Sequence, residues 1–102
     1  MPITTEINDK TAIIKLSGGI DYSMQNAFKE ANDQALAANE VTNIEVDFKD
    51  ASFLDSAGIR ALISLKKTAD ELGKTLLIKN CNETIFQIFE IGGFNTMFTF
   101  QQ

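Results

Sequence analysis

Apolar and polar residues alternate in several short stretches of the chain, and this spacing predicts β-strands. Over residues 41–48, Ile44, Val46 and Phe48 fall on one side, and amide or acidic side chains fall between them. Further stretches of this kind predict strands over residues 3–7, 11–16, 75–79 and 95–100. The run Ser17-Gly18-Gly19 is interpreted as the break that ends the strand over 11–16.

Between these stretches, apolar residues recur at the three- and four-residue spacing of helix faces. This spacing predicts helices over residues 22–38, 56–72 and 83–91. Gly73 is placed to end the second helix in a left-handed conformation, and Asn82 is placed to cap the third. Because strands alternate with helices, we predict an α/β fold with a mixed, mostly parallel sheet of four to five strands. The helices are expected on one face of that sheet, and water on the other.

Composition supports one soluble, folded unit. The chain has 102 residues, of which 44% are hydrophobic and 23% charged, and no linker interrupts it, so we expect a single domain over residues 1–102. No apolar run approaches the roughly 20 residues that span a bilayer, and no signal-like stretch opens the sequence. We therefore expect a cytoplasmic protein without membrane insertion. The net charge of −5 argues against nucleic acid as a partner.

The chain contains no histidine, which narrows the chemistry available to it. Catalytic triads and histidine-dependent metal sites are excluded, and the usual general base near neutral pH is missing. The single cysteine, Cys81, cannot form an internal disulfide and is predicted to be a small, partly buried side chain near a strand end. We therefore expect no enzymatic activity, no cofactor and no metal.

The segment from Phe53 to Arg60 holds the candidate site. We expect a strand to end near Phe48 and a short loop to lead into a helix at Ser56, where Asp55 or Ser56 could serve simply as the N-cap. Gly58, inside the first turn, costs about 1 kcal/mol relative to alanine and so indicates close approach of another group. A phosphate on Ser56 would lie at a helix N-terminus, where free N–H groups and the helix dipole favour an anion.

Two motifs in the right order resemble a known family. The stretch Val46-Asp-Phe-Lys-Asp-Ala-Ser-Phe-Leu-Asp-Ser-Ala-Gly-Ile59 and the segments that follow it to Phe100 resemble the STAS domain of bacterial anti-sigma factor antagonists. Leu16-Ser-Gly-Gly-Ile-Asp21 resembles the Gly-x-Leu-Asp element of that family. The resemblance implies that Ser56 is phosphorylated by a partner anti-sigma factor that is a serine kinase. Unmodified antagonist would bind this partner and release a sigma factor, and a PP2C-type phosphatase would reset Ser56.

The resemblance also implies a partner-binding surface made of two segments, 20–24 and 53–60. Its residues are Asp21, Tyr22, Phe53, Asp55, Ser56, Ala57, Gly58 and Arg60. Ala57 departs from the family, which often has a second Ser or Thr at this position. Arg60 has a plainer interpretation as part of a solvated helix face. An alternative function also stays open, namely a non-phosphorylated STAS adaptor in a membrane-associated or stress-sensing complex, with Ser56 only capping its helix.

Overall fold

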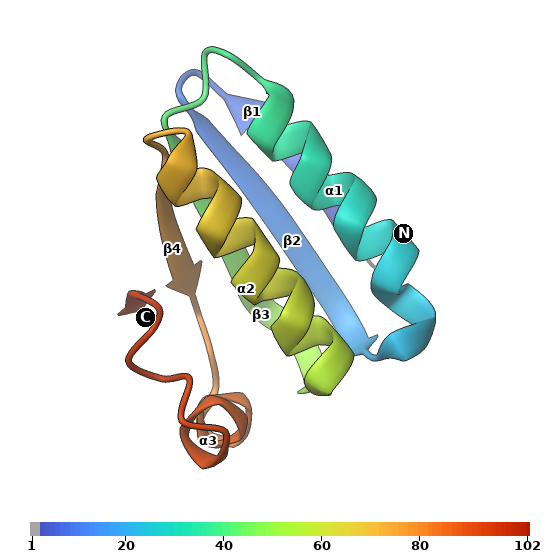
Figure 1. The fold of residues 1–102 in the computed structure, drawn as a ribbon. Helices are drawn as coiled ribbons and strands as arrows, with labels where there is room; N and C mark the ends of the chain where they lie inside the picture. Colours follow the sequence, from blue (N-terminus) through green and yellow to red (C-terminus); the bar gives the residue numbers. More distant parts are fainter. Residues whose placement is uncertain (1–2) are drawn as a thin grey trace.

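The computed structural model describes residues 3–102, which form a five-stranded sheet in the order β1-β2-β3-β4-β5 (Figure 1). The β1–β2 pair is antiparallel, and the other three pairs are parallel. This arrangement confirms the predicted α/β fold with a mixed, mostly parallel sheet. The strands are β1 (Ile3–Asn8), β2 (Thr11–Ile20), β3 (Asn43–Leu54), β4 (Thr75–Lys79) and β5 (Phe100–Gln101). The helices are the 3-10 turn η1 (Tyr22–Met24), α1 (Gln25–Ala37), α2 (Ser56–Glu71) and α3 (Glu83–Ile91).

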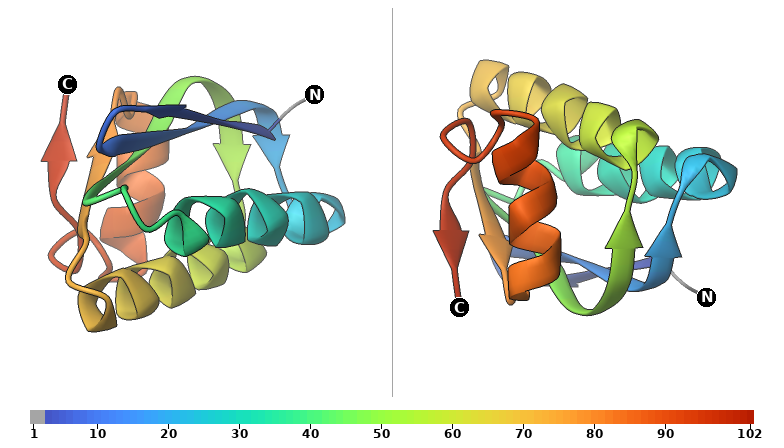
Figure 2. Two further views of the ribbon diagram at one scale, coloured as in Figure 1. Left: turned by 90° about the horizontal axis from the view of Figure 1, so that it is seen from above. Right: turned by 90° about the horizontal axis from the view of Figure 1, so that it is seen from below.

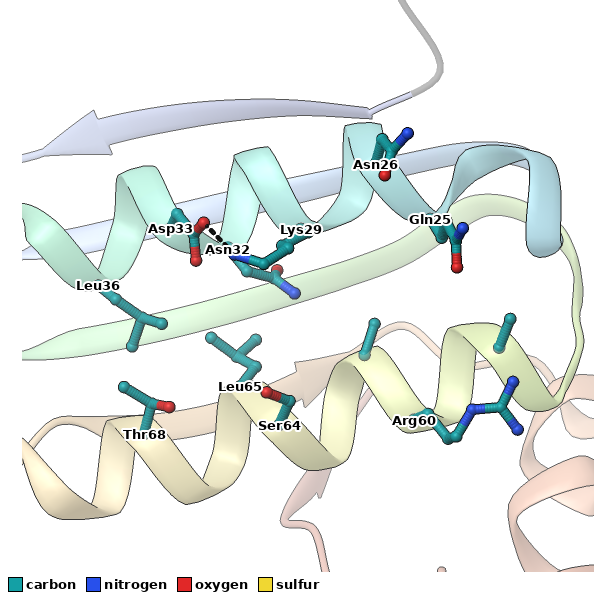
Figure 3. Close-up of a pocket in the computed structure, with 12 residues that line it drawn as sticks. Gln25, Asn26, Lys29, Asn32, Asp33, Leu36, Arg60, Ser64, Leu65 and Thr68 are labelled. Atoms are coloured by element: carbon teal, nitrogen blue, oxygen red, sulfur yellow. Dashed lines mark hydrogen bonds and ion pairs between the residues drawn. The ribbon is translucent and has the colours of Figure 1, made fainter.

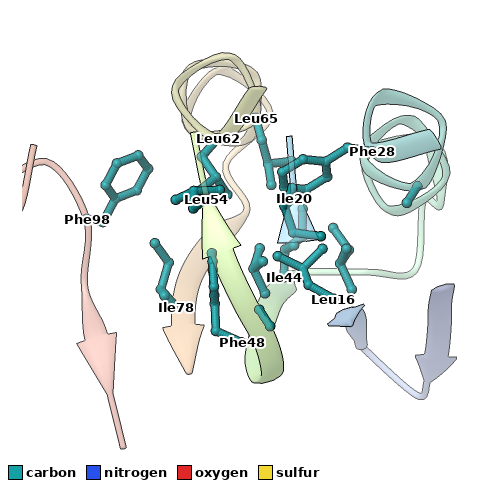
Figure 4. Close-up of a cluster of buried hydrophobic side chains, with 14 of the residues drawn as sticks. Leu16, Ile20, Phe28, Ile44, Phe48, Leu54, Leu62, Leu65, Ile78 and Phe98 are labelled. Atoms are coloured by element: carbon teal, nitrogen blue, oxygen red, sulfur yellow. The ribbon is translucent and has the colours of Figure 1, made fainter. Parts of the chain in front are cut away.

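Helices α1 and α2 cover one face of the sheet, where they lie side by side along the strands (Figures 1 and 2). Helix α3 is seen end-on in Figure 1, and it crosses one end of the sheet next to β3 and β4 (Figures 1 and 2). The strand register places Ile14, Val46 and Ile78 in one fully buried row beneath the helices. Figure 4 shows the core that results, with side chains from β2, β3 and β4 meeting Phe28 of α1 and Leu62 of α2.

The other face of the sheet carries charged side chains, as the alternating pattern predicts. Lys15 Nζ lies 2.8 Å from a carboxylate oxygen of Glu6, and Lys79 Nζ lies 3.8 Å from one of Glu45. The hydrogen bond and charge of Glu6 raise the pKa of Lys15 above its ordinary value. These ion pairs confirm that this face is open to water.

Two strands are longer than predicted, and both extend toward the candidate site. The expected break at Ser17-Gly18-Gly19 is wrong, because β2 continues through these residues to Ile20. Register shifts between Lys15 and Ser17 and between Gly18 and Gly19 absorb the irregularity, and Gly18 takes a positive φ of 74°. The expected end of β3 near Phe48 is also wrong, because β3 stays paired with β2 as far as Leu54.

The last strand is much shorter than the predicted 95–100, because its aromatic residues pack instead of pairing. Only Phe100 and Gln101 pair with β4. The preceding residues form turns, with the Phe94 N–H donating to the Phe89 carbonyl at 2.8 Å. Phe98 is buried with its ring centroid 5.7 Å from that of Phe89. The spacing of the phenylalanines therefore reflects a small aromatic core under α3.

The remaining boundaries follow the sequence closely. The first helix begins with η1 at Tyr22 and becomes α-helical only at Gln25. Gly73 has a φ of 72° after α2, and the Asn82 side chain accepts from the Ile85 N–H at 2.8 Å, which confirms both predicted helix ends. Cys81 is buried, and burial raises the pKa of its thiol to about 12. None of the helices in residues 3–102 is long and apolar enough to cross a membrane.

Candidate functional site

The two predicted segments meet where β2 and β3 end. Ile20 and Leu54 are paired across the strands, and the Asp55 N–H donates to the Ile20 carbonyl at 3.2 Å. The Tyr22 N–H in turn donates to Asp55 Oδ2 at 3.0 Å. The start of η1 and the start of α2 are therefore tied together by hydrogen bonds, and the longer strands explain why they arrive side by side.

Asp55 is the N-cap of α2. Its Oδ1 accepts from the Ala57 N–H at 2.9 Å and from the Gly58 N–H at 3.1 Å. Of the two candidate caps the structure selects Asp55, and Ser56 is the exposed first residue of the helix. No hydrogen bond in the described part of the chain involves the Ser56 hydroxyl. The interpretation of Ser56 as a helix cap is therefore wrong.

This capping changes what a phosphate on Ser56 would meet. The sequence predicts free N–H groups at the start of α2, but Asp55 already occupies two of them, those of Ala57 and Gly58. Asp21 is engaged in the same way, since its Oδ1 accepts from the Ser23 N–H at 2.9 Å. A phosphate on Ser56 would lie at the start of α2, as predicted, but the Ala57 and Gly58 N–H groups would not be free to bind it.

Gly58 is where close packing requires a glycine. A Cβ at this position would lie 2.4 Å from Leu54 Cδ1 and 3.3 Å from the Ile20 carbonyl oxygen. Leu54 is fully buried, and the Ile20 carbonyl is held by its bond to the Asp55 N–H. The close approach inferred from the sequence is confirmed.

We expect Gly58→Ala to destabilise the protein by about 1–2 kcal/mol. Alanine gains about 1 kcal/mol of helix propensity, but crowding a packed core costs typically about 1–3 kcal/mol, and here backbone as well as side chain must shift. Urea unfolding followed by circular dichroism measures the difference. Ser64→Ala, at an exposed position of the same helix, is the matched control. An unfolding midpoint for Gly58→Ala at or above that of the wild type would contradict the packing argument.

The predicted partner-binding residues differ in how much of their surface is exposed to solvent. Tyr22 is 65% exposed and Phe53 50% exposed, an unusual placement for large aromatic rings beside a charged helix start. Ala57 and Gly58 are buried, so of the predicted residues they are the least accessible, and their role in partner binding stays a prediction. The exposed members are Asp21, Tyr22, Phe53, Ser56 and Arg60.

A groove between α1 and α2 adjoins this surface and was not predicted from the sequence. It has a volume of about 420 Å³ and runs from Arg60 and Gln25 along both helices (Figure 3). Asn32 lines it with only 5% of its surface exposed, and its Oδ1 has no hydrogen-bond partner. A polar residue one turn after Phe28, on the buried face of α1, is the signal that could have revealed the groove. No group of acidic or cysteine side chains suited to a metal ion occurs within residues 3–102.

Comparison with known proteins agrees with this architecture. Residues 2–102 match the STAS domain family. The anti-sigma F factor antagonist of Paenibacillus polymyxa is 20% identical over 93 residues, which are 91% of this chain and 80% of that protein. The structure of the Bacillus cell fate determinant SpoIIAA in its phosphorylated form superposes with a TM-score of 0.75 at 20% identity, covering 98% of this chain and 91% of SpoIIAA. A sulfate transporter family protein from Wolinella succinogenes gives a TM-score of 0.77 at 15% identity, covering 93% and 80% of the two chains.

Proposed function

Since the chain belongs to the STAS domain family, we propose that it is an anti-sigma factor antagonist switched by phosphorylation of Ser56. In the unmodified state it binds a serine-kinase anti-sigma factor in the cytoplasm and so releases a sigma factor. The kinase transfers the γ-phosphoryl group of ATP to Ser56 Oγ, and a PP2C-type phosphatase removes it. The relative named as an anti-sigma F factor antagonist and the structure of phosphorylated SpoIIAA support this choice within the family.

The position of Ser56 carries the proposal. Its hydroxyl is exposed at the first residue of a rigid helix and is not used for capping, so it is available to a kinase. Phosphorylation adds about −1.5 to −2 charge beside Asp21 and Asp55. A partner docked on Tyr22 and Phe53 would have to desolvate that charge, which is costly unless the partner supplies cations. The same surface can therefore bind in one state and repel in the other.

The alternative, a non-switching adaptor, draws on the likeness to the sulfate transporter family protein. In that function Ser56 would serve only as a cap. Asp55 performs the capping, so the adaptor hypothesis assigns no task to the exposed serine hydroxyl. The two functions differ in one measurable respect, which is whether partner binding depends on the charge at position 56.

The test uses the full chain and the serine-kinase anti-sigma factor of the same organism. Incubation with ATP should add the mass of one phosphate to the wild type and to Ser52→Ala, a nearby exposed serine, but not to Ser56→Ala. Ser56→Asp should weaken binding to the kinase at least about tenfold, or about 1.4 kcal/mol, in calorimetric titration. Phosphate retained by Ser56→Ala, or equal binding by Ser56→Asp, would contradict the proposal.

A further inference from the structure

We propose that Arg60 binds the phosphate on Ser56 and so leaves the partner-binding surface when the protein is phosphorylated. The inference rests on the proposed function in one respect, namely that Ser56 is the modified residue. It adds a second effect to the switch. Phosphorylation would both introduce negative charge and neutralise the cation that the surface offers.

The helix places these two residues together. Ser56 and Arg60 are four residues apart on α2, so their side chains lie on one face, one turn from each other. Side chains on an α-helix lean toward its N-terminus, which directs Arg60 back toward Ser56. Figure 3 shows the Arg60 guanidinium extended along α2 toward the end where the helix begins. The arginine therefore needs only a rotamer adjustment to reach a phosphate on Ser56.

The surroundings leave the phosphate few other partners. Asp55 occupies the Ala57 and Gly58 N–H groups, and both Asp21 and Asp55 are themselves negative. Arg60 is the only basic residue in segments 18–24 and 52–60. Lys29, which lines the neighbouring groove from α1, is paired with Asp33 at 2.7 Å.

Arg60 itself is available. It is exposed, and it forms no ion pair within the described residues. A guanidinium can donate two parallel hydrogen bonds to phosphate oxygens, which makes it better suited to this contact than an ammonium group. Before phosphorylation the same guanidinium is exposed at the end of the groove between α1 and α2, within the segment 53–60 assigned to the partner.

The experiment places phosphoserine at position 56 during translation, so that it needs no kinase. The second pKa of the phosphate, about 6 for an exposed phosphoserine, is followed by ³¹P NMR. Arg60→Ala should raise this pKa by about 0.3, because removing the cation disfavours the dianion. Lys67→Ala is the matched control, since an exposed cation eleven residues along α2 lies about 16 Å away and is screened. Arg60→Lys should give an intermediate value.

A second readout comes from the arginine itself. Arg60 is the only arginine in the chain, so its side-chain Nε–H signal in a ¹⁵N-labelled sample is unambiguous. The signal should shift, and its hydrogen exchange should slow, in the phosphorylated protein compared with the unmodified one. Equal phosphate pKa values in wild type and Arg60→Ala, or equal changes in Arg60→Ala and Lys67→Ala, would overturn the inference. Neither result depends on whether a kinase modifies Ser56, so failure of the proposed function would be seen separately.

Discussion

Replacing Phe89 with alanine is expected to lower the free energy of unfolding by about 3–5 kcal/mol. The ring is fully buried, and its centroid lies 6.2 Å from that of Phe48, 5.7 Å from that of Phe98 and 5.2 Å from that of Phe100. All these pairs are edge-to-face contacts, which add stability beyond the buried area. The truncation removes the ring that joins α3 and the C-terminal segment to β3. The free energy of unfolding of a small domain is about 5–15 kcal/mol in total. A loss of this size should therefore leave the variant close to unfolding in the absence of denaturant.

Urea unfolding monitored by circular dichroism measures this loss. Phe53→Ala is the matched control, because it makes the same chemical change at a ring that is half exposed. Phe53→Ala should lower the free energy of unfolding by about 1 kcal/mol or less. Phe89→Leu should recover part of the loss by refilling some of the cavity. Equal losses in Phe89→Ala and Phe53→Ala would show that the aromatic cluster does not hold the C-terminal segment in place.

Asp55→Ala is expected to lower the free energy of unfolding by about 2–3 kcal/mol. A helix N-cap alone contributes about 0.5–2 kcal/mol, and a hydrogen bond to a charged group about 1.5–3 kcal/mol. Asp55 supplies both, because Oδ1 caps α2 at Ala57 and Gly58 while Oδ2 accepts from the Tyr22 N–H. The partial exposure of the side chain places the sum near the lower end.

Asp55→Asn separates the two contributions. Asparagine caps helices about as well as aspartate, but its one carbonyl oxygen cannot both cap α2 and accept from Tyr22. We expect about half the loss of Asp55→Ala, together with faster hydrogen exchange at the Tyr22 amide and little change at Ala57. Asp21→Ala, which removes only the cap of η1, serves as a second control. The tie between the segments would be refuted if the Tyr22 amide exchanged at the same rate in all three variants and the wild type.

Much of the fold is predictable because the residues that begin and end several of its helices and strands act locally. Strand β4 and helix α3 begin and end where the sequence predicts, since Gly73 precedes the strand and Asn82 caps the helix. The ends of β2 and β3 are not predictable in this way. Gly18 and Gly19 usually signal a break, and only pairing with a distant strand converts them into bulges. The prediction of a strand over 95–100 is wrong for the opposite reason. Phe98 and Phe100 alternate as in a strand, but only Phe100 pairs with β4, and Phe98 packs against the ring of Phe89.

The candidate site shows a similar division. The meeting of segments 20–24 and 53–60 is predictable from the family resemblance alone, because the strand ends that bring them together were not predicted. The choice between Asp55 and Ser56 as the helix cap is not predictable from the sequence, because both residue types favour that position. It is decided by which side chain accepts hydrogen bonds from the first turn, and in the structure that is Asp55. The groove with Asn32 depends on the distance between two helices, which single-sequence periodicity does not report.

The exposed Tyr22 gives the protein an intrinsic fluorescence signal at the candidate site. Tyr22 is the only tyrosine, and the chain has no tryptophan, so ultraviolet emission excited above the phenylalanine band comes from this one ring. The ring is 65% exposed, and its backbone N–H bonds to the residue that precedes Ser56. Intrinsic fluorescence of the unlabelled protein is therefore a local reporter of solvent and charge beside the serine, and a tryptophan-free partner could be titrated against it directly.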